Sequence, residues 1–296
     1  MTSRERVLAA VERRAPDRLP LDLGSSPVTG MHASSVYALR QALGLDAPGT
    51  PVRVVEPYQM LGEIAPDLLD ALGADIVPLA GPRTKFGYPL GGWKPWTLFD
   101  GTPVVVPGDF NTEPSADGGI LQYPQGDRSA PPSAVMPEDG FYFDTIVRQP
   151  PIDEDALRWE DNTEEFAPIS GADVEHYAAL AKRQRATGRA VLAAFGWTSF
   201  GDISNVPAPA LKHPKGIRDI AEWYMSVAIR RDYVRKVFER QLEVGLANLA
   251  RVASVLRDDV DVVLVSGADF GSQAGPLASP ATYRDLFRPL HAEVNA

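Results

Sequence analysis

The chain has 296 residues, of which 44% are hydrophobic, and a formal net charge of −10 with a pI near 4.9. No long linker divides it, so we expect a single domain over residues 1–296. The acidic balance argues against nucleic acid as a partner. The lack of cysteine excludes disulfides, thiolate metal ligands and a cysteine nucleophile within these residues. No apolar stretch approaches the ~20 residues of a membrane helix and no signal-peptide core is present, so we expect a cytoplasmic protein without membrane contact.

The amino-terminal segment predicts a helix followed by a first strand. Thr2 to Glu5 has the spacing of a capping box, and Pro16 ends the helix. The apolar run 18–24 predicts a strand, and a polar loop and a helix follow it. Asp22 and Gly24 therefore lie at a strand exit, and we take both as candidate substrate-binding residues.

The next segment continues the alternation of strands and helices. A strand is expected over 52–57, a helix over 64–72 with Gly73 as its C-cap, and a strand over 74–79. The sequence composition changes over 83–150, where aromatic residues and prolines cluster.

Residues 83–150 predict an irregular β insertion of hairpins and loops within the domain. Asp100-Gly101 and Asp117-Gly118 are hairpin signals. So long an excursion either forms a lid or wall of the ligand site, or packs on the exterior as a decoration.

The second half of the chain returns to regular elements. We expect helices over 172–187, 217–230 and 233–256 and a buried strand over 190–196. The strand exit combines Trp197 with Asp202, which makes it a candidate wall of a site.

The β-branched run 260–265 predicts a strand buried on both faces, as in parallel sheets. A glycine loop with Asp269, Ser272 and Gln273 follows, and Ser279-Pro280 then begins a helix. Ligands of βα folds bind at such strand exits. The alternative is that Asp269 only caps a turn.

Alternating strands and helices predict an α/β fold, either a doubly wound sheet or a (β/α)8 TIM barrel. No Gly-x-Gly-x-x-Gly turn follows the first strand, which favours the barrel. Four or five barrel strands are countable. We therefore expect an incomplete barrel whose chain is truncated at its carboxyl end.

Three segments stand out as motifs: the opening 2–24, Gly-Ala-Asp-Phe-Gly-Ser-Gln at 267–273, and Leu-Ala-Ser-Pro-Ala-Thr-Tyr-Arg-Asp-Leu-Phe-Arg-Pro at 277–289. Together they resemble the uroporphyrinogen decarboxylase (URO-D) superfamily. The resemblance runs from end to end of the chain. It implies the (β/α)8 barrel of the URO-D domain. Two groups of enzymes share this domain, the tetrapyrrole decarboxylase of the haem pathway and the cobamide-dependent methyltransferases.

The decarboxylase branch fits less well. A substrate with many carboxylates calls for arginines after the first strand, and the loop 24–30 carries no cation. By alignment, the aspartate of the decarboxylases falls near Ala80 and their tyrosine near Asp202. Uroporphyrinogen III decarboxylation in porphyrin biosynthesis is therefore the alternative function.

The methyltransferase branch is closer in its motifs. It implies corrinoid-linked methyl transfer to a thiol or related acceptor, with a corrinoid (methylcobamide) or a corrinoid protein as partner and a zinc held by His and Cys. No cysteine occurs here, and the histidines stand at no ligand spacing, so we assign no metal ligands. The histidines are His32, His176, His213 and His291.

Under the enzyme hypothesis, the carboxylates of Asp202 and Asp269 are the catalytic candidates, since they orient a polar substrate or receive a proton. Trp197 either packs against a flat ligand ring or is an ordinary core aromatic. The expected substrate-binding residues are Asp22, Gly24, Trp197, Ser272 and Gln273. The contrasting hypothesis is a non-catalytic partial barrel that needs a C-terminal segment, a partner chain or a homo-oligomer.

Overall fold

The structure, a computed structural model, describes all residues 1–296 and has a mixed α/β fold without a closed barrel. Its central sheet has three parallel strands in the order β11-β10-β3. These strands are β3 (Ile76–Leu79), β10 (Ala190–Ala193) and β11 (Val262–Val263). Their order in the sheet follows their order in the chain.

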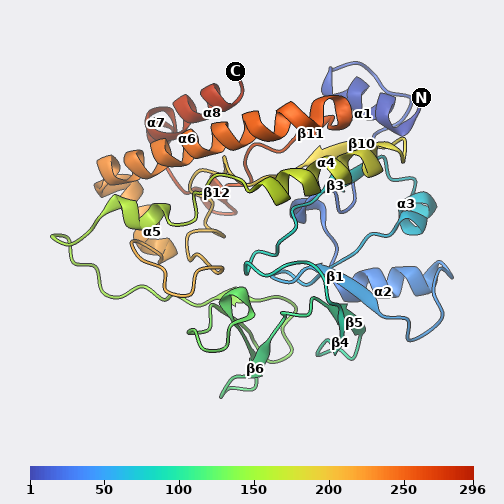
Figure 1. Ribbon diagram of the computed structural model, residues 1–296, viewed down its shortest axis with the longest axis horizontal. Coiled ribbons are helices and arrows are strands. Elements are labelled where there is room, and N and C mark those ends of the chain that lie inside the picture. The colour runs from blue at the N-terminus through green and yellow to red at the C-terminus, as the bar shows by residue number, and fades with distance from the viewer.

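Two long helices cover the central sheet, α4 (Gly171–Arg185) and α6 (Arg231–Leu256), as Figure 1 shows. Ser170 caps α4 by accepting a hydrogen bond from the Asp173 N–H at 3.0 Å. The helices and strands share an apolar core, because alternate strand residues face the helices. Its buried members include Val77, Leu79, Tyr177, Leu180, Val191, Ala193, Val252 and Leu256.

Helix α1 (Ser3–Val11) begins at Thr2 with the predicted capping box. It lies at the amino ends of the strands, where its Arg6 reaches the fully buried Asp75 with Nη1 2.6 Å from Oδ1. Arg18 donates to the same carboxylate at 2.7 and 2.9 Å, and the Leu21 N–H donates at 2.9 Å. One carboxylate therefore joins α1, the segment after it and β3.

A second aspartate does the same for β10 and β11. The Asp261 side chain is 1% exposed and accepts from Arg4 at 2.7 Å and from the Val191 N–H at 3.0 Å. Arg185, at the end of α4, adds a longer contact of 3.4 Å. The amino ends of the parallel strands are thus tied by two paired, buried charges.

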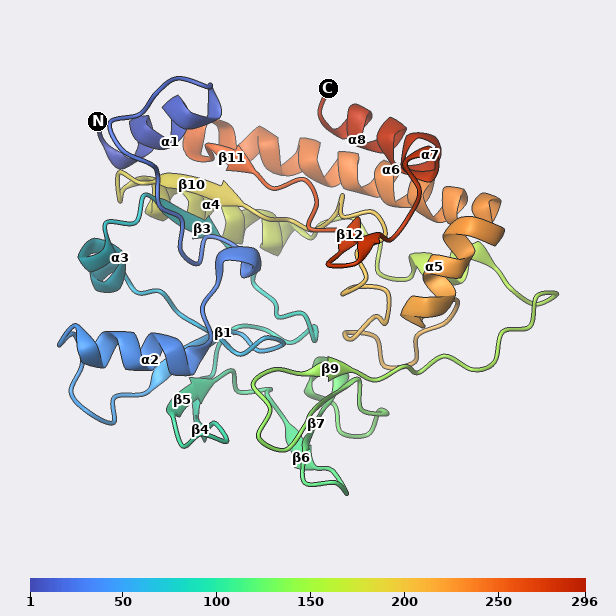
Figure 2. The same ribbon diagram turned by 180° about the vertical axis from the view of Figure 1, so that it is seen from behind.

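Two further sheets lie at the bottom of the molecule in Figure 2; the insertion forms one of them alone and shares the other with the segment that precedes it. One has the order β2-β1-β5-β4 and the other β6-β7-β8-β9. The strands of the first are β1 (Val52–Glu56), β2 (Leu61–Gly62), β4 (Lys94–Thr97) and β5 (Pro103–Val106). Those of the second are β6 (Thr112–Pro114), β7 (Ile120–Gln122), β8 (Ala134–Met136) and β9 (Asp144–Thr145).

Both hairpin signals of the insertion are confirmed. Asp100-Gly101 joins β4 to β5, and Asp117-Gly118 joins β6 to β7. Helices α2 (Ala33–Ala42) and α3 (Pro66–Leu72) flank these sheets, and Gly73 ends α3 in the left-handed conformation, as predicted. The insertion shares one apolar core with α2, β1 and α3, to which Val36, Val54 and Leu68 belong. That core includes Phe86, Tyr88, Phe110, Met136 and Phe143.

The remaining helices pack against the amino-terminal half of α6 in a third core. Ser279 caps the segment beginning at Pro280, as predicted. The elements are α5 (Ile220–Ile229), α7 (Pro280–Thr282), the π-helical turn η5 (Tyr283–Phe287), α8 (Arg288–Val294) and a ribbon of β12 (Gly271–Ser272) with β13 (Gly275–Pro276).

Three strand predictions need correction. Residues 18–24 form no strand, because Pro20 has no N–H and the Leu21 N–H bonds the Asp75 side chain instead of a strand. The predicted strand 52–57 is β1, but it pairs with β2 and β5 and so lies outside the central sheet.

The third correction concerns 260–265. It was expected to be buried on both faces, but its regular part is short and Val263 is 44% exposed. β11 has a neighbour on one side only, β10, so it is an edge strand. The central sheet therefore has three regular strands, where four or five were expected. No helix of the structure is both long and apolar enough to cross a membrane.

The Asp75 contacts predict a large stability effect. In Asp75→Asn, Arg6 and Arg18 lose their common counter-charge at a buried position, so we expect about 3 kcal/mol less unfolding free energy in urea. The matched control is Asp70→Asn, whose carboxylate is 72% exposed and pairs with Arg189. It should change stability by no more than about 0.5 kcal/mol. Equal effects of the two variants would show that the buried network is not what holds α1 to the sheet.

Candidate functional site

The loops that leave β10 and β11 are held together at the carboxyl ends of the strands. The Thr198 hydroxyl donates to the Val265 carbonyl at 2.5 Å, and the Gly267 N–H donates to the Ser199 hydroxyl at 3.4 Å. Because of these contacts, the residues that follow each strand form one surface, which is where ligands bind in parallel α/β folds.

Asp202 lies half-buried in the loop after β10. Its Oδ1 accepts hydrogen bonds from the Ser204 N–H at 2.9 Å and from the Ser204 hydroxyl at 2.6 Å. Oδ2 receives no hydrogen bond from the protein. The turn thus fixes the carboxylate while leaving one oxygen free for a ligand or a proton.

Lys85 lies in the loop after β3, within the insertion, and Asp202 is one of the charges that act on it. Its Nζ lies 4.4 Å from the centre of the Tyr58 ring, a cation–π contact, and makes no hydrogen bond or ion pair within the chain. Burial lowers the pKa of Lys85, and the negative charges of Asp202 and Glu56 oppose that shift. A half-buried ammonium without a paired carboxylate is uncommon in a purely structural role.

Glu56 and Tyr58 complete this group. The Glu56 carboxylate accepts from the Tyr58 N–H at 3.1 Å and the Gln59 N–H at 2.8 Å, and burial raises its pKa. Burial also raises the pKa of Tyr58, and the nearby carboxylates of Asp144 and Asp202 add to that shift. We refer to Glu56, Tyr58, Lys85 and Asp202 as the Lys85 cluster.

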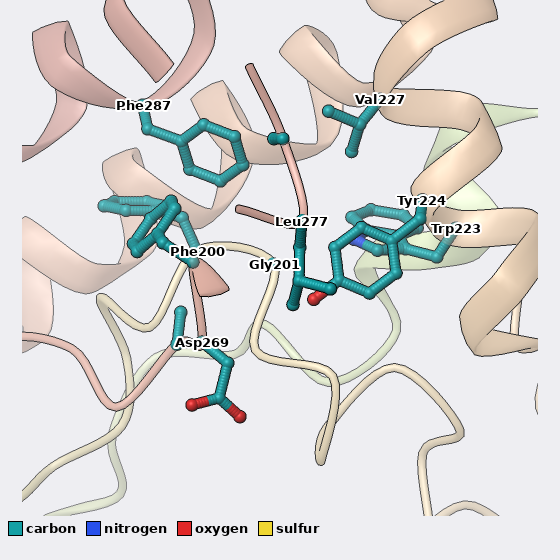
Figure 3. Close-up of a pocket in the computed structure, with 11 residues that line it drawn as sticks. Phe200, Gly201, Trp223, Tyr224, Val227, Asp269, Leu277 and Phe287 are labelled. Carbon is teal, nitrogen blue, oxygen red and sulfur yellow. The ribbon is translucent and has the colours of Figure 1, made fainter. Parts of the chain in front are cut away.

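An apolar pocket adjoins the cluster between α5 and the loop after β11 (Figure 3). It encloses about 320 Å³, counting the solvent at its mouth, and its centre leaves room for a group the size of one methyl or one water. The pocket is bounded mainly by aromatic rings and holds two polar side chains, Tyr224 and Asp269. Its apolar walls include Phe200, Trp223, Val227, Phe270, Leu277 and Phe287.

The Tyr224 hydroxyl is buried and has no hydrogen-bond partner. Figure 3 shows it directed toward Leu277 and Gly201, whereas the exposed carboxylate of Asp269 points away from the rings. Burial raises the pKa of Tyr224, and the charges of Asp269 and Asp202 raise it further. Both predicted catalytic aspartates therefore lie near one phenol.

The structure does not join Asp22 to this surface by any contact. Its carboxylate accepts from the Ser25 hydroxyl at 2.6 Å, the Ser25 N–H at 3.2 Å and the Thr29 hydroxyl at 3.2 Å, so it stabilises its own turn. At Gly24, a Cβ atom would come within 2.6 Å of Ile64, and φ is +74°, so glycine is required for packing there.

Three other predicted residues also lie apart from the cluster. Trp197 stacks on Phe195 with ring centres 4.8 Å apart and meets Tyr177 edge-on, within the core under α4. Ser272 and Gln273 are exposed on the β12–β13 ribbon, where the Ser272 hydroxyl bonds the Gly275 carbonyl at 3.3 Å.

Sequence reasoning missed Glu56, Tyr58, Lys85 and Tyr224. A usable signal exists for two of them, because Glu56 ends β1 and Lys85 follows β3 within a few residues. The sequence gives no such signal for Tyr58 and Tyr224, since their proximity to Asp202 depends on the tertiary packing of the insertion and of α5.

His32 lies elsewhere, beside a second hollow near α2. Its Nε2 is 2.8 Å from the Phe141 carbonyl, and its Nδ1 accepts from the Ser34 N–H at 3.3 Å. Burial lowers the pKa of His32. The ring therefore caps α2 and holds the 139–141 turn.

Comparison with protein-family models, curated proteins and solved structures returns no match. No three side chains among His, Asp and Glu lie close enough together to hold a metal ion. The residues present therefore do not fit the zinc that the family resemblance implies. They do not fit a resident corrin ring either, since Trp197 packs on Phe195 and the pocket is narrow.

The Lys85 environment predicts a distinct titration. After reductive ¹³C-methylation, we expect the Lys85 dimethylamine to titrate at lower pH than free dimethyl-lysine, because burial disfavours its charged form. Asp202→Asn should lower that pKa further, since it removes an attracting charge. NMR of the methyl signals measures both. An unchanged Lys85 titration in Asp202→Asn would refute the coupling between the two groups.

Proposed function

We propose that the chain is an enzyme of the URO-D superfamily whose active site is the Lys85 cluster. The observation that carries this proposal is the Lys85 ammonium, which lies over the Tyr58 ring without a hydrogen bond or ion pair in the chain, together with the Asp202 carboxylate, which has one oxygen free and whose charge acts on Lys85. Strand order supports the family, because neighbouring strands of a (β/α)8 barrel also follow one another in the chain.

The reaction we propose is methyl transfer to a thiol or a related acceptor. Such an acceptor reacts as its anion, so a proton must leave it when the methyl group arrives. Lys85 in its neutral form is a suitable base, because its lowered pKa brings it closer to the ~8.5 of a free thiol. The proton moves from sulfur to Lys85 Nζ, and the resulting ammonium is stabilised by Asp202.

In this account the work that zinc performs in the family's methyltransferases falls to Lys85, since the chain offers no fitting ligands. The methyl donor is a corrinoid on a separate carrier, which would supply the methyl group from outside and would keep the electron pair of the bond that breaks between it and the methyl carbon. The residues of this chain bind the acceptor, hold its proton and keep the amine partly dehydrated.

Substitution of Lys85 tests the proposal. Lys85→Met should reduce methylation of a thiol panel by methylcobalamin about 10²- to 10⁴-fold, the usual contribution of a positioned base. Lys85→Arg should fail equally, because a guanidinium does not lose its proton below pH 12. The matched control is Lys94→Met, whose amine bonds Asn111 at 3.1 Å within the insertion. Activity retained in both Lys85 variants would remove the base from the mechanism.

Decarboxylation of a carboxylate substrate is the second candidate, favoured by the same ammonium, which would pair with the carboxylate and return a proton to carbon. The pH profile separates the two reactions. Methyl transfer should accelerate as pH rises through the Lys85 pKa, because the neutral amine is the active form. Decarboxylation should slow over the same interval, because the ammonium is then the active form. Carbon dioxide release and thioether formation identify the product directly.

A further inference from the structure

We infer that Tyr58 is the residue that positions Lys85: the face of its ring holds the ammonium in place and stabilises the charged amine relative to the neutral one. The role of Tyr58 in catalysis rests on the proposed function, in which Lys85 takes up a proton. The contact between the ring and the ammonium does not depend on that function, because it is present in the structure and is measurable without any reaction.

Tyr58 lies in the turn that joins β1 to β2, and the backbone of this turn is closely fixed. Pro57, the residue before it, has its φ restricted by its own ring. The Glu56 carboxylate accepts from the Tyr58 N–H at 3.1 Å, and the Tyr58 carbonyl accepts from the Phe143 N–H at 2.9 Å. The turn ends at Met60, which is fully buried. These contacts leave the backbone of Tyr58 little freedom, so its ring stands at a defined place.

The ring of Tyr58 packs against the insertion and also meets Lys85. Its centre lies 6.0 Å from the centre of the Phe86 ring, with the two planes tilted by 55°. Lys85 Nζ lies 4.4 Å from the centre of the Tyr58 ring, within the ~6 Å over which the negative face of an aromatic ring attracts a cation. Phe86 is fully buried and follows Lys85 in the chain, so the residue that packs on the ring also fixes the backbone from which the lysine extends.

The contact with the ring is the only directional interaction that the structure gives the Lys85 ammonium. The carboxylates of Glu56 and Asp202 act on it through their charge, and neither forms an ion pair with it. Burial disfavours the ammonium, and a cation–π contact strengthens where water is partly excluded, so the ring offsets part of the cost of burial. When Lys85 takes a proton from the acceptor, the ring therefore stabilises the ammonium that forms. A leucine at this position would pack on Phe86 but would present no negative face.

Titration of Lys85 by NMR tests the contact without any reaction. In the reductively ¹³C-methylated protein, with the signal assigned by its absence in Lys85→Arg, Tyr58→Leu should lower the Lys85 pKa by about one pH unit. Tyr58→Phe keeps the ring face and should leave that pKa within about 0.3 pH units of the parent value. The matched control is Tyr37→Leu, since Tyr37 packs half-buried on the same apolar core and its hydroxyl accepts from the Gly49 N–H. An unchanged or raised Lys85 pKa in Tyr58→Leu would overturn the inference.

Fluorination separates the charge distribution of the ring from its shape. Phenylalanine analogues with one, two and three ring fluorines, incorporated at position 58, weaken the negative face stepwise while the ring still packs on Phe86. The Lys85 pKa should fall with each added fluorine. This series decides the question even where Tyr58→Leu disturbs the turn, and a pKa that does not change with fluorine content would contradict the inference.

The pH profile of methyl transfer tests the catalytic role. In Tyr58→Leu, the rise in rate should move to lower pH by the same interval as the NMR titration. The rate above that rise should be about threefold to tenfold lower, because the amine is a weaker base and is less well positioned. Tyr58→Phe should restore both. An unchanged profile in Tyr58→Leu would remove the positioning role. If the parent chain transfers no methyl group, the proposed function fails, and the NMR titration still decides whether the ring holds Lys85.

Discussion

The pairing of Asp75 and Asp261 with arginines at the amino ends of the parallel strands is the constraint on which the central sheet depends. Each carboxylate is almost fully buried, and each accepts both a guanidinium and a backbone N–H. A buried carboxylate without these partners would be strongly unfavourable, so the partners and the sheet form together. Burial acts to raise the pKa of Asp75, but hydrogen bonds from Leu21, Arg18 and Arg6 hold it below the usual range. The stability it contributes is therefore present above the ordinary carboxyl pKa and is lost as pH falls through its lower folded value.

This arrangement separates stability from chemistry along the strands. The ionic contacts lie at the amino ends, and the glycine-bearing loops with Asp202 and Asp269 lie at the carboxyl ends. Because ion pairs hold the sheet at the amino ends of its strands, the loops at the carboxyl ends need few contacts of their own. Two hydrogen bonds join the turns after β10 and β11. The groups left unpaired in this region include the Lys85 ammonium, one oxygen of Asp202, the Asp269 carboxylate and the Tyr224 phenol. Polar groups without partners are what a ligand-binding surface requires, since water or substrate can satisfy them.

Local chemistry made much of the fold predictable. Capping residues Thr2 and Ser279, the C-cap Gly73 and the hairpin turns were readable because each depends on a few adjacent residues. The prediction of a strand at 18–24 was wrong because the Asp75 carboxylate, more than fifty positions away, accepts the Leu21 N–H that a neighbouring strand would otherwise bind. The candidate site could be predicted in part, because strand exits also depend on adjacent residues. A strand exit indicates Asp202 and Asp269, but whether an acidic residue bonds its own turn, as Asp22 does, is decided by neighbours such as Ser25 and Thr29.

The insertion contributes Lys85 to the cluster. The sequence leaves open whether the insertion is a wall of a ligand site or a decoration of the exterior. Lys85 lies near the start of the insertion, and the charge of Asp144, near its end, helps to raise the pKa of Tyr58. Its aromatic core holds Phe86 and Phe143 edge to face at 5.8 Å, directly beside these residues in the chain. Without that core, Lys85 would be hydrated and its pKa would return toward the value of a free amine, since burial is the main cause of its shift. The insertion therefore supplies the burial that lowers the pKa of Lys85, while the loop after β10 supplies the opposing charge of Asp202.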